Sequence, residues 1–211
     1  MKIKKREVVI VLGRTGQGKS IWSRQFMHDK KRLLVYDPLM EANVDYLSTA
    51  KLIEFAEVHP DKRDKNFRYG TANPDDVPLL DSCAYGYGDC WLFLEEASVV
   101  FPSNSRSPEW IRNSIFLGRH RNLSMIITAQ RPTSIPVDLR SQASRIICFS
   151  QHEKNDVSWL GNYFGEQTLL ISELQPLECL DSDGRNIKKY DINPKKDDQK
   201  KYIQKSGYFE Q

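Results

Sequence analysis

The sequence lacks any apolar run that could cross a membrane. Its longest uninterrupted apolar stretches, such as Val8–Leu12 and Trp91–Leu94, fall far short of the roughly 18 to 20 residues that a membrane helix needs. The basic start, from Lys2 to Arg6, resembles that of a signal peptide, but Glu7 interrupts it and the apolar run that follows ends at Gly13 without a cleavage site. We therefore expect neither a membrane span nor export.

Cysteine, glycine and proline are also scarce. The 211 residues include four cysteines, 11 glycines and 10 prolines, while 39% are hydrophobic. This composition excludes disordered and fibrous chains and predicts a globular domain of ordinary size. The cysteines show no C-x-x-C pair and no histidine at the spacing of a zinc site, so we expect buried, reduced thiols. They are Cys83, Cys90, Cys148 and Cys179.

Positive charge is weak overall but concentrated in one segment. The net charge of +3 is too small for the whole surface to bind nucleic acid as a polycation. Residues 106–145 nevertheless contain seven arginines, no lysine and two acids. Because the planar guanidinium group binds phosphate and carboxylate through paired hydrogen bonds, this segment indicates phosphate recognition or pairing between subunits, with a solvated basic face as the alternative. The arginines are Arg106, Arg112, Arg119, Arg121, Arg131, Arg140 and Arg145.

Strand-like and helix-like segments alternate along the chain. Short apolar and β-branched runs predict buried strands, and the segments between them are long enough to cross over a sheet face. The pattern predicts an α/β fold in which a mainly parallel sheet is flanked by helices on both faces. Expected strands lie at 7–13, 31–36, 90–94, 123–128 and 145–149, and expected helices at 19–28, 44–58 and 107–118.

Two stretches are too polar for a buried strand or helix to be expected. Pro60–Pro78 is rich in Asp, Lys and Arg, which is typical of a loop or an irregular insertion. The chain beyond Asp181 is mostly polar and predicts a short tail. We therefore expect an ordered domain over residues 1–180 and a polar C-terminal tail over residues 181–211.

A phosphate-binding motif follows the first expected strand. Gly13-Arg14-Thr15-Gly16-Gln17-Gly18-Lys19-Ser20 satisfies the pattern G-x-x-x-x-G-K-[ST], between a strand and a helix as the motif requires. Glycines let backbone N–H groups surround phosphates, and the positive end of the helix faces the same groups. Lys19 should reach the β- and γ-phosphates of ATP, and the Ser20 hydroxyl should bind Mg²⁺. We expect ATP to contact residues 13–21, the last being Ile21.

Two acids and a glutamine follow later strands. Glu95 and Glu96 end the strand 90–94, where open α/β sheets place their ligands. We expect Glu95 to be the acid on the Mg²⁺ side and Glu96 the general base that activates water, the alternative being two solvated acids at a helix start. Gln130 ends the strand 123–128, and could bond both the γ-phosphate and the attacking water, unless it is an ordinary loop residue.

These blocks, in this order, resemble the FtsK–HerA superfamily of DNA-pumping ATPases. The resemblance rests on the phosphate loop, the strand ending in Glu95-Glu96, Gly118-Arg119-His120, Thr128-Ala-Gln130-Arg-Pro132 and Ser144–Phe149. It covers about residues 7 to 150 and is most specific at Gln130-Arg131-Pro132. Within the superfamily, this short chain is most similar to the genome-packaging ATPases of tailless icosahedral viruses with an internal membrane.

The resemblance implies a fold, an activity and partners. It implies a RecA-like (ASCE) P-loop NTPase core, a ring of six subunits, and ATP-driven movement of double-stranded DNA. It also implies packaging of a viral genome into a preformed capsid in the host cytoplasm. The implied partners are capsid-vertex or membrane-associated viral proteins, and the implied place in the virion is a unique vertex.

The resemblance also implies a finger arginine donated across the subunit interface. Arg119 matches its position best, and Arg145 and Lys154 match it less well. The family usually has Asp-Glu where this chain has Glu95-Glu96, which leaves the division of roles between the two acids open.

Two other function classes remain open. A secretion or filamentous-phage assembly ATPase of the zonula-occludens-toxin type shares the glutamine block, and a nucleoside or nucleotide kinase shares the length and the early phosphate loop. A kinase would need an acceptor pocket and an arginine-rich lid, whereas paired acids and Gln130 suit the activation of water. For DNA contacts, the candidates are the polar loop after Pro60 and the segment Phe101–Arg106.

Overall fold

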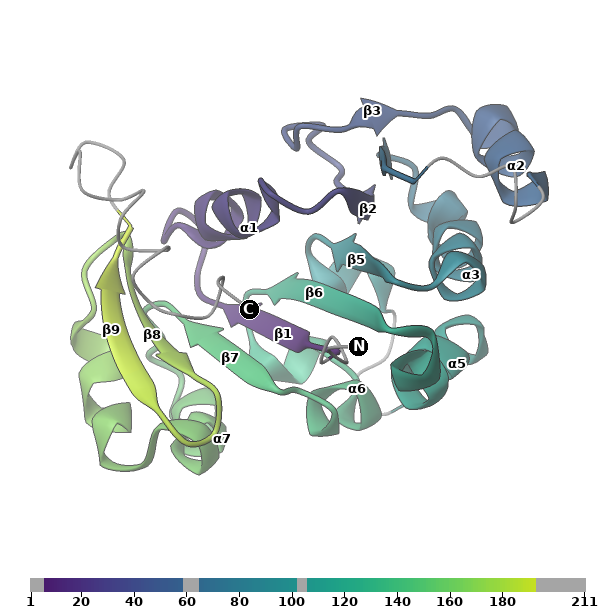
Figure 1. Cartoon of the computed structure of the whole chain (residues 1–211). Coiled ribbons are helices and arrows are strands. Elements are labelled where there is room, and N and C mark those ends of the chain that lie inside the picture. Colours follow the sequence, from purple (N-terminus) through teal and green to yellow (C-terminus); the bar gives the residue numbers. More distant parts are fainter. Residues whose placement is uncertain (1–5, 59–64, 102–105, 193–211) are drawn as a thin grey trace.

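The structure is a computed structural model, and it describes residues 6–58, 65–101 and 106–192. Its centre is a nine-stranded sheet in the order β3-β4-β2-β5-β6-β1-β7-β8-β9 (Figure 1). All neighbouring pairs from β3 to β7 are parallel, and the pairs β7–β8 and β8–β9 are antiparallel. In that order the strands are Asp45–Tyr46, Phe67–Thr71, Arg32–Tyr36, Cys90–Leu94, Leu123–Ala129, Val8–Leu12, Arg145–Cys148, Glu178–Ser182 and Ile187–Asp191. The mainly parallel α/β sheet is the predicted fold class.

Helices cover both faces of the sheet, as predicted. In β1, Val9 and Val11 face a core formed with α1, while Val8, Ile10 and Leu12 face a larger core formed with the other helices. This alternation follows from the period of two in a strand, and a central parallel strand is apolar throughout because both faces are covered. The helices are α1 (Lys19–Met27), α2 (Thr49–Glu57), α3 (Val77–Tyr87), α4 (Ala97–Val100), α5 (Glu109–Leu117), α6 (Val137–Ser141) and α7 (Lys154–Phe164), with 3₁₀ turns at Pro74–Asp76, Gly118–Arg121, Pro132–Ser134 and Gly165–Glu173.

Strand β6 lies between β1 and β5, and this order positions the site. Leu12 at the end of β1 is in register with Ala129 of β6, and Leu94 at the end of β5 is in register with Ile127. The carboxyl ends of the three strands therefore meet at one edge of the sheet. The phosphate loop, Gln130 and Glu95 follow these strand ends directly.

The polar stretch Pro60–Pro78 is not wholly a loop, so that prediction was wrong. It contains β4, which pairs in parallel with both β2 and β3. Arg68 lies in this strand, and its guanidinium donates to the carbonyls of Met27 and Asn43 at 3.0 and 3.1 Å. Phe67 is buried, and its ring lies 5.4 Å from that of Phe55. The charge of the segment therefore concealed a strand whose polar side chain is satisfied by distant backbone.

The helix predicted for residues 44–58 is shorter than expected. Asp45–Tyr46 forms the edge strand β3, and the helix begins only at Thr49, after Ser48 accepts a hydrogen bond from the Lys51 N–H at 3.5 Å. Serine is a preferred N-cap residue, which explains the start. The five predicted strands and the helices predicted at 19–28 and 107–118 are confirmed to within two residues.

The sheet continues beyond residue 180, where the sequence predicts the tail to begin. Strands β8 and β9 extend it to Asp191. Asp181 looks like a tail residue in the sequence, but it is buried against Arg145 of β7. The boundary predicted at residue 180 therefore falls inside a strand, and residues 193–211 lie outside the described part of the chain.

Two predictions from composition can be compared with the structure. The four cysteines are all buried, as expected. Over residues 6–58, 65–101 and 106–192, no helix combines the length and the apolar character that crossing a bilayer requires.

One buried acid predicts a dependence of stability on pH. Asp81 of α3 is 2% exposed, its Oδ1 has no hydrogen-bond partner within the described residues, and burial raises its pKa to about 7. In the unfolded chain the carboxyl ionises near its ordinary value of 3.8, so the unfolded state holds fewer protons between these values and stability falls as pH rises from about 4 to 7.

Asp81→Asn should remove most of that fall and raise the free energy of unfolding at pH 8 by about 2 to 4 kcal/mol. Urea unfolding at pH 4 and pH 8 measures both effects. Asp75→Asn, at an exposed site just before the same helix, is the control and should change neither. A pH profile of Asp81→Asn that parallels the wild type would contradict this assignment.

Candidate active site

The phosphate loop is closely packed at its first glycine. A Cβ at Gly13 would lie 2.6 Å from Phe149 Cβ, so no other residue fits without movement of that backbone. At the other end, Gly18 has φ +113° and precedes α1 without a side-chain cap. The first N–H groups of α1 are therefore open to an anion, as phosphate binding at a helix N-terminus requires.

Lys19 lies beside this loop as a buried cation. It is 9% exposed, and its Nζ donates to the Arg14 carbonyl at 3.2 Å. Burial lowers its pKa, while the nearby charges of Glu96 and Glu95 act in the opposite direction. A buried ammonium group with a neutral hydrogen-bond acceptor is suited to an anionic ligand, which would offset the cost of burying its charge.

Glu95 joins the phosphate loop to the end of β5. The Ser20 hydroxyl donates to its Oε1 at 2.5 Å, and the carboxylate is 8% exposed. Burial raises the pKa of Glu95 to about 7. The hydrogen bond from Ser20 acts to lower this pKa, and the negative charge of Asp37 acts to raise it further. The structure thus places together the two residues that the sequence assigns to Mg²⁺, Ser20 and Glu95.

Asp37, at the end of β2, is an acid that the sequence motifs do not reveal. It is 1% exposed and accepts hydrogen bonds from the N–H groups of Leu39, Glu41 and Ala42 and from the Tyr46 hydroxyl, at 2.7 to 2.9 Å. Burial alone would raise its pKa, but these hydrogen bonds hold the pKa below its ordinary value. The only sequence signal is Asp-Pro after the strand, a pair that is typical of a strand end or a turn and does not indicate a site.

Glu96 has an unusual backbone conformation. Its φ of +57° is in the left-handed region, which is costly for a residue with a Cβ. Its N–H donates to Thr128 Oγ1 at 2.9 Å, and its carboxylate accepts from the Ser98 hydroxyl at 2.7 Å. The hydrogen bond to Thr128 of β6 anchors the turn, and strained residues of this kind are often found at functional sites.

Gln130 lies at the carboxyl end of β6, between the strands that carry the loop and the acids. It is exposed, and its backbone carbonyl accepts from the Nε2 of the buried Gln151 at 2.6 Å. The next residue, Arg131, pairs with the buried Asp156 at 2.8 Å. These two contacts hold the chain at Gln130 and at the residue that follows it, and the sequence motifs predict neither Gln151 nor Asp156 as a partner.

Arg119 lies at the opposite end of the sheet. It belongs to the turn Gly118–Arg121, just before β6 begins, and Gly118 packs against Arg6, which precedes β1. Seven strand residues at about 3.3 Å each separate the two ends of β6, so Arg119 is roughly 20 Å from the phosphate loop of its own chain. It is exposed.

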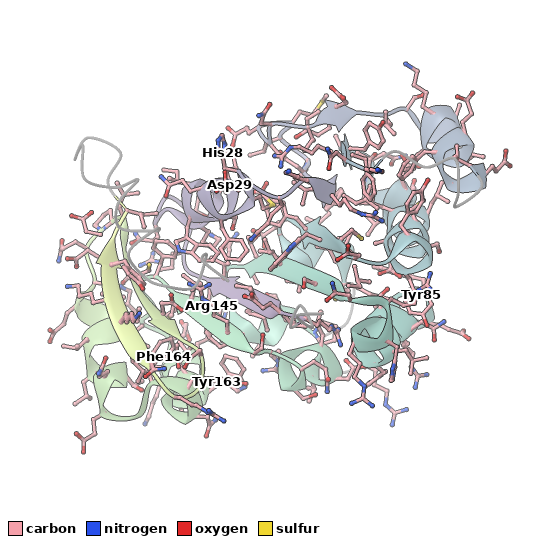
Figure 2. All side chains as sticks on the ribbon, in the orientation of Figure 1. His28, Asp29, Tyr85, Arg145, Tyr163 and Phe164 are labelled. Atoms are coloured by element: carbon pink, nitrogen blue, oxygen red, sulfur yellow. The ribbon has the colours of Figure 1, made fainter. Side chains whose placement is uncertain are left out.

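Arg145 was a second candidate for the finger arginine, but its position in the structure does not fit that role. It is 6% exposed, and its guanidinium makes two hydrogen bonds to Asp181, at 2.9 and 2.6 Å. The same group lies 5.5 Å from the rings of Trp22 and Phe26 in α1. Figure 2 labels Arg145 within the body of the molecule. A guanidinium held in this way cannot reach the nucleotide of a neighbouring subunit.

The donors present fit Mg²⁺ held jointly with a nucleotide. Within the described residues no group of three or more His, Cys, Asp or Glu side chains could hold a metal ion by itself. Mg²⁺ is usually bound by one or two oxygen ligands from the protein together with substrate phosphates and water. Ser20 and Glu95 supply such oxygens beside the phosphate loop.

Solved structures match this fold over most of the chain. The genome packaging NTPase B204 from Sulfolobus turreted icosahedral virus 2, in complex with ATP-gammaS, has a TM-score of 0.70 at 19% identity, covering 90% of this chain and 98% of that chain. The chain has the fold of a P-loop NTPase. The N-terminal domain of zonular occludens toxin from Neisseria meningitidis has a TM-score of 0.51 at 14% identity, covering 91% and 97%. The pCW3 conjugation coupling protein TcpA, with ATPgS, has a TM-score of 0.61 at 12% identity, covering 90% and 61%.

The P-loop NTPase fold of this chain agrees with the fold that its motifs imply. No protein-family model matches the sequence, and no curated protein matches it. At these sequence identities the structural likeness establishes the fold alone. The roles of the residues that line the site therefore rest on their own geometry.

Proposed function

We propose that this P-loop NTPase is an ATPase that moves double-stranded DNA, and that it packages a viral genome into a preformed capsid. The observation that carries the ATPase assignment is the contact between the two halves of the site, in which Ser20 of the phosphate loop donates to Glu95 at the end of β5. DNA packaging is supported by the motif resemblance and by the fold shared with the B204 genome packaging NTPase.

Each site residue has a proposed task in hydrolysis. The loop N–H groups and Lys19 bind the phosphates of ATP, and Ser20 and Glu95 hold Mg²⁺, which offsets charge on the phosphate oxygens. Glu96 accepts the proton of the attacking water, and Gln130 orients that water against the γ-phosphate. Asp37 holds the backbone that follows β2 beside Glu95.

A ring of subunits, proposed to have six members, accounts for the position of Arg119. Because Arg119 lies at the amino end of the sheet, it cannot serve the nucleotide of its own chain, but a head-to-tail interface would bring it to the carboxyl end of a neighbour. The proposed partners are double-stranded DNA and proteins of the capsid vertex or the viral membrane. The proposed location is the host cytoplasm, with the ring at a unique vertex of the virion.

Arg119→Ala should leave ATP binding nearly unchanged and reduce hydrolysis by about a hundredfold or more, since a finger arginine contacts the phosphates mainly in the transition state. Binding of ATP-gammaS and steady-state phosphate release measure the two effects. Arg112→Ala is a matched control, because Arg112 is also exposed but lies in the preceding helix. Unchanged turnover in Arg119→Ala would refute the finger assignment.

The test of the proposed function is ATP hydrolysis with and without double-stranded DNA, with Lys19→Ala as the blank. Stimulation by DNA is the expected result. Hydrolysis that is indifferent to DNA would favour a secretion or phage-assembly ATPase, the second candidate, which is supported by the shared fold with the zonular occludens toxin domain. Phosphate transfer to a nucleoside in preference to water would indicate a kinase.

A further inference from the structure

The phosphate loop is bonded to the far end of the described chain. The Leu177 N–H donates to the Gln17 carbonyl at 3.0 Å, and the Ile192 N–H donates to the Leu177 carbonyl at 2.8 Å. Leu177 precedes β8 and Ile192 follows β9, so both residues lie at the open end of the β8–β9 hairpin. The hairpin is therefore tied directly to the peptide between Gln17 and Gly18.

Side chains reinforce this connection. A Cβ at Gly18 would lie 3.0 Å from Leu177 Cδ2, 3.1 Å from Ile192 Cδ1 and 3.1 Å from Phe149 Cε1. Ile192 is 6% exposed. Three apolar side chains thus pack against the Cα of Gly18, the residue at which the loop becomes helix α1.

Leu177 makes this contact from a costly backbone conformation. Its φ is +72°, in the left-handed region, although it is not a glycine. Such a conformation persists where surrounding contacts over-determine it. The two hydrogen bonds through Leu177 are contacts of this kind.

We propose that Leu177 and Ile192 are positioning residues for the phosphate loop. In a trans peptide the C=O and N–H groups point in opposite directions. An anchor on the Gln17 carbonyl therefore directs the Gly18 N–H away from the hairpin, and the side chains packed on Gly18 prevent the peptide from rotating. This inference rests on the proposed function, because it assumes that the loop binds ATP phosphates.

The test compares two isoleucines of one hairpin. Ile192→Ala should weaken ATP-gammaS binding, measured by calorimetry, by about tenfold, while turnover at saturating ATP falls by less than about twofold. Ile187→Ala is the matched control, since Ile187 lies at the other end of β9 and packs on the opposite core, and its affinity should match the wild type. Ile192→Val keeps most of the packing, so its affinity for ATP-gammaS should fall by only about twofold to threefold. This variant replaces Ile192→Ala in the test if Ile192→Ala does not fold.

Unchanged affinity in Ile192→Ala, or equal weakening in Ile192→Ala and Ile187→Ala, would overturn the inference. Hydrogen exchange gives a second readout, because ATP-gammaS should slow exchange of the Leu177 amide in the wild type and leave the Ile187 amide unaffected. Failure of the wild-type chain to bind ATP-gammaS would instead refute the proposed function, so the two failures can be told apart.

Discussion

Arg145→Ala should destabilise the protein by about 3 to 5 kcal/mol, because it leaves the Asp181 carboxylate buried without its partner. For a chain of this size the thermal midpoint should fall by on the order of 10 °C. The variant also removes the guanidinium beside the rings of Trp22 and Phe26, which opens a space next to α1. Thermal unfolding followed by circular dichroism measures the loss.

The double variant Arg145→Met with Asp181→Leu is the control for this prediction. Replacing both members of a buried ion pair with apolar side chains of similar size is often neutral or stabilising, so the double variant should recover most of the lost stability. If Arg145→Ala kept the stability of the wild type and lost only ATP hydrolysis, Arg145 would be a finger residue after all.

Glu96→Gln should bind ATP with nearly wild-type affinity and lose turnover by about a hundredfold to ten-thousandfold. The amide keeps the size of the side chain and can still accept the hydrogen bond from Ser98, but it cannot take a proton from water. A filter-binding assay should find unhydrolysed ATP trapped on the variant, and single-turnover kinetics should give the rate of the chemical step.

Glu95→Gln is the comparison that assigns the two acids. Since Glu95 bonds Ser20, its loss should weaken binding of the nucleotide together with Mg²⁺, and raising the Mg²⁺ concentration should restore part of the affinity. A variant Glu95→Gln that binds ATP normally without turning it over, beside a Glu96→Gln that retains activity, would reverse the roles.

The central strands could be predicted because each contains a short run of apolar, often β-branched, residues. Strands β1, β5 and β7 are buried on both faces, and continuous apolar runs such as Val8–Leu12 follow from that environment. Strands β4 and β8 were missed because polar residues in them are satisfied by distant groups. Arg68 bonds backbone carbonyls and Asp181 pairs with Arg145, and no local pattern encodes such partners.

The residues of the candidate site could likewise be predicted only where a local sequence motif marks them. A motif with fixed spacing located the phosphate loop, and the strand ending in Glu95-Glu96 located the acids. Asp37 has no comparable signal, because its neighbour Glu95 is brought close only by the pairing of β2 with β5. Arg145 was misassigned for a related reason, since its position in the sequence resembles that of a finger and its burial depends on β8.

The order of strands in the sheet also dictates when the site can form during synthesis. Strand β1 is the first strand to leave the ribosome, but its neighbours are β6 and β7, more than 100 residues later in the chain. Leu177 and Ile192, which contact the phosphate loop, are made later still. The nascent chain therefore carries a nucleotide-binding motif that cannot adopt its final shape until almost the whole described chain has emerged. Folding should accordingly be slow, with exposed apolar strands that chaperones can recognise.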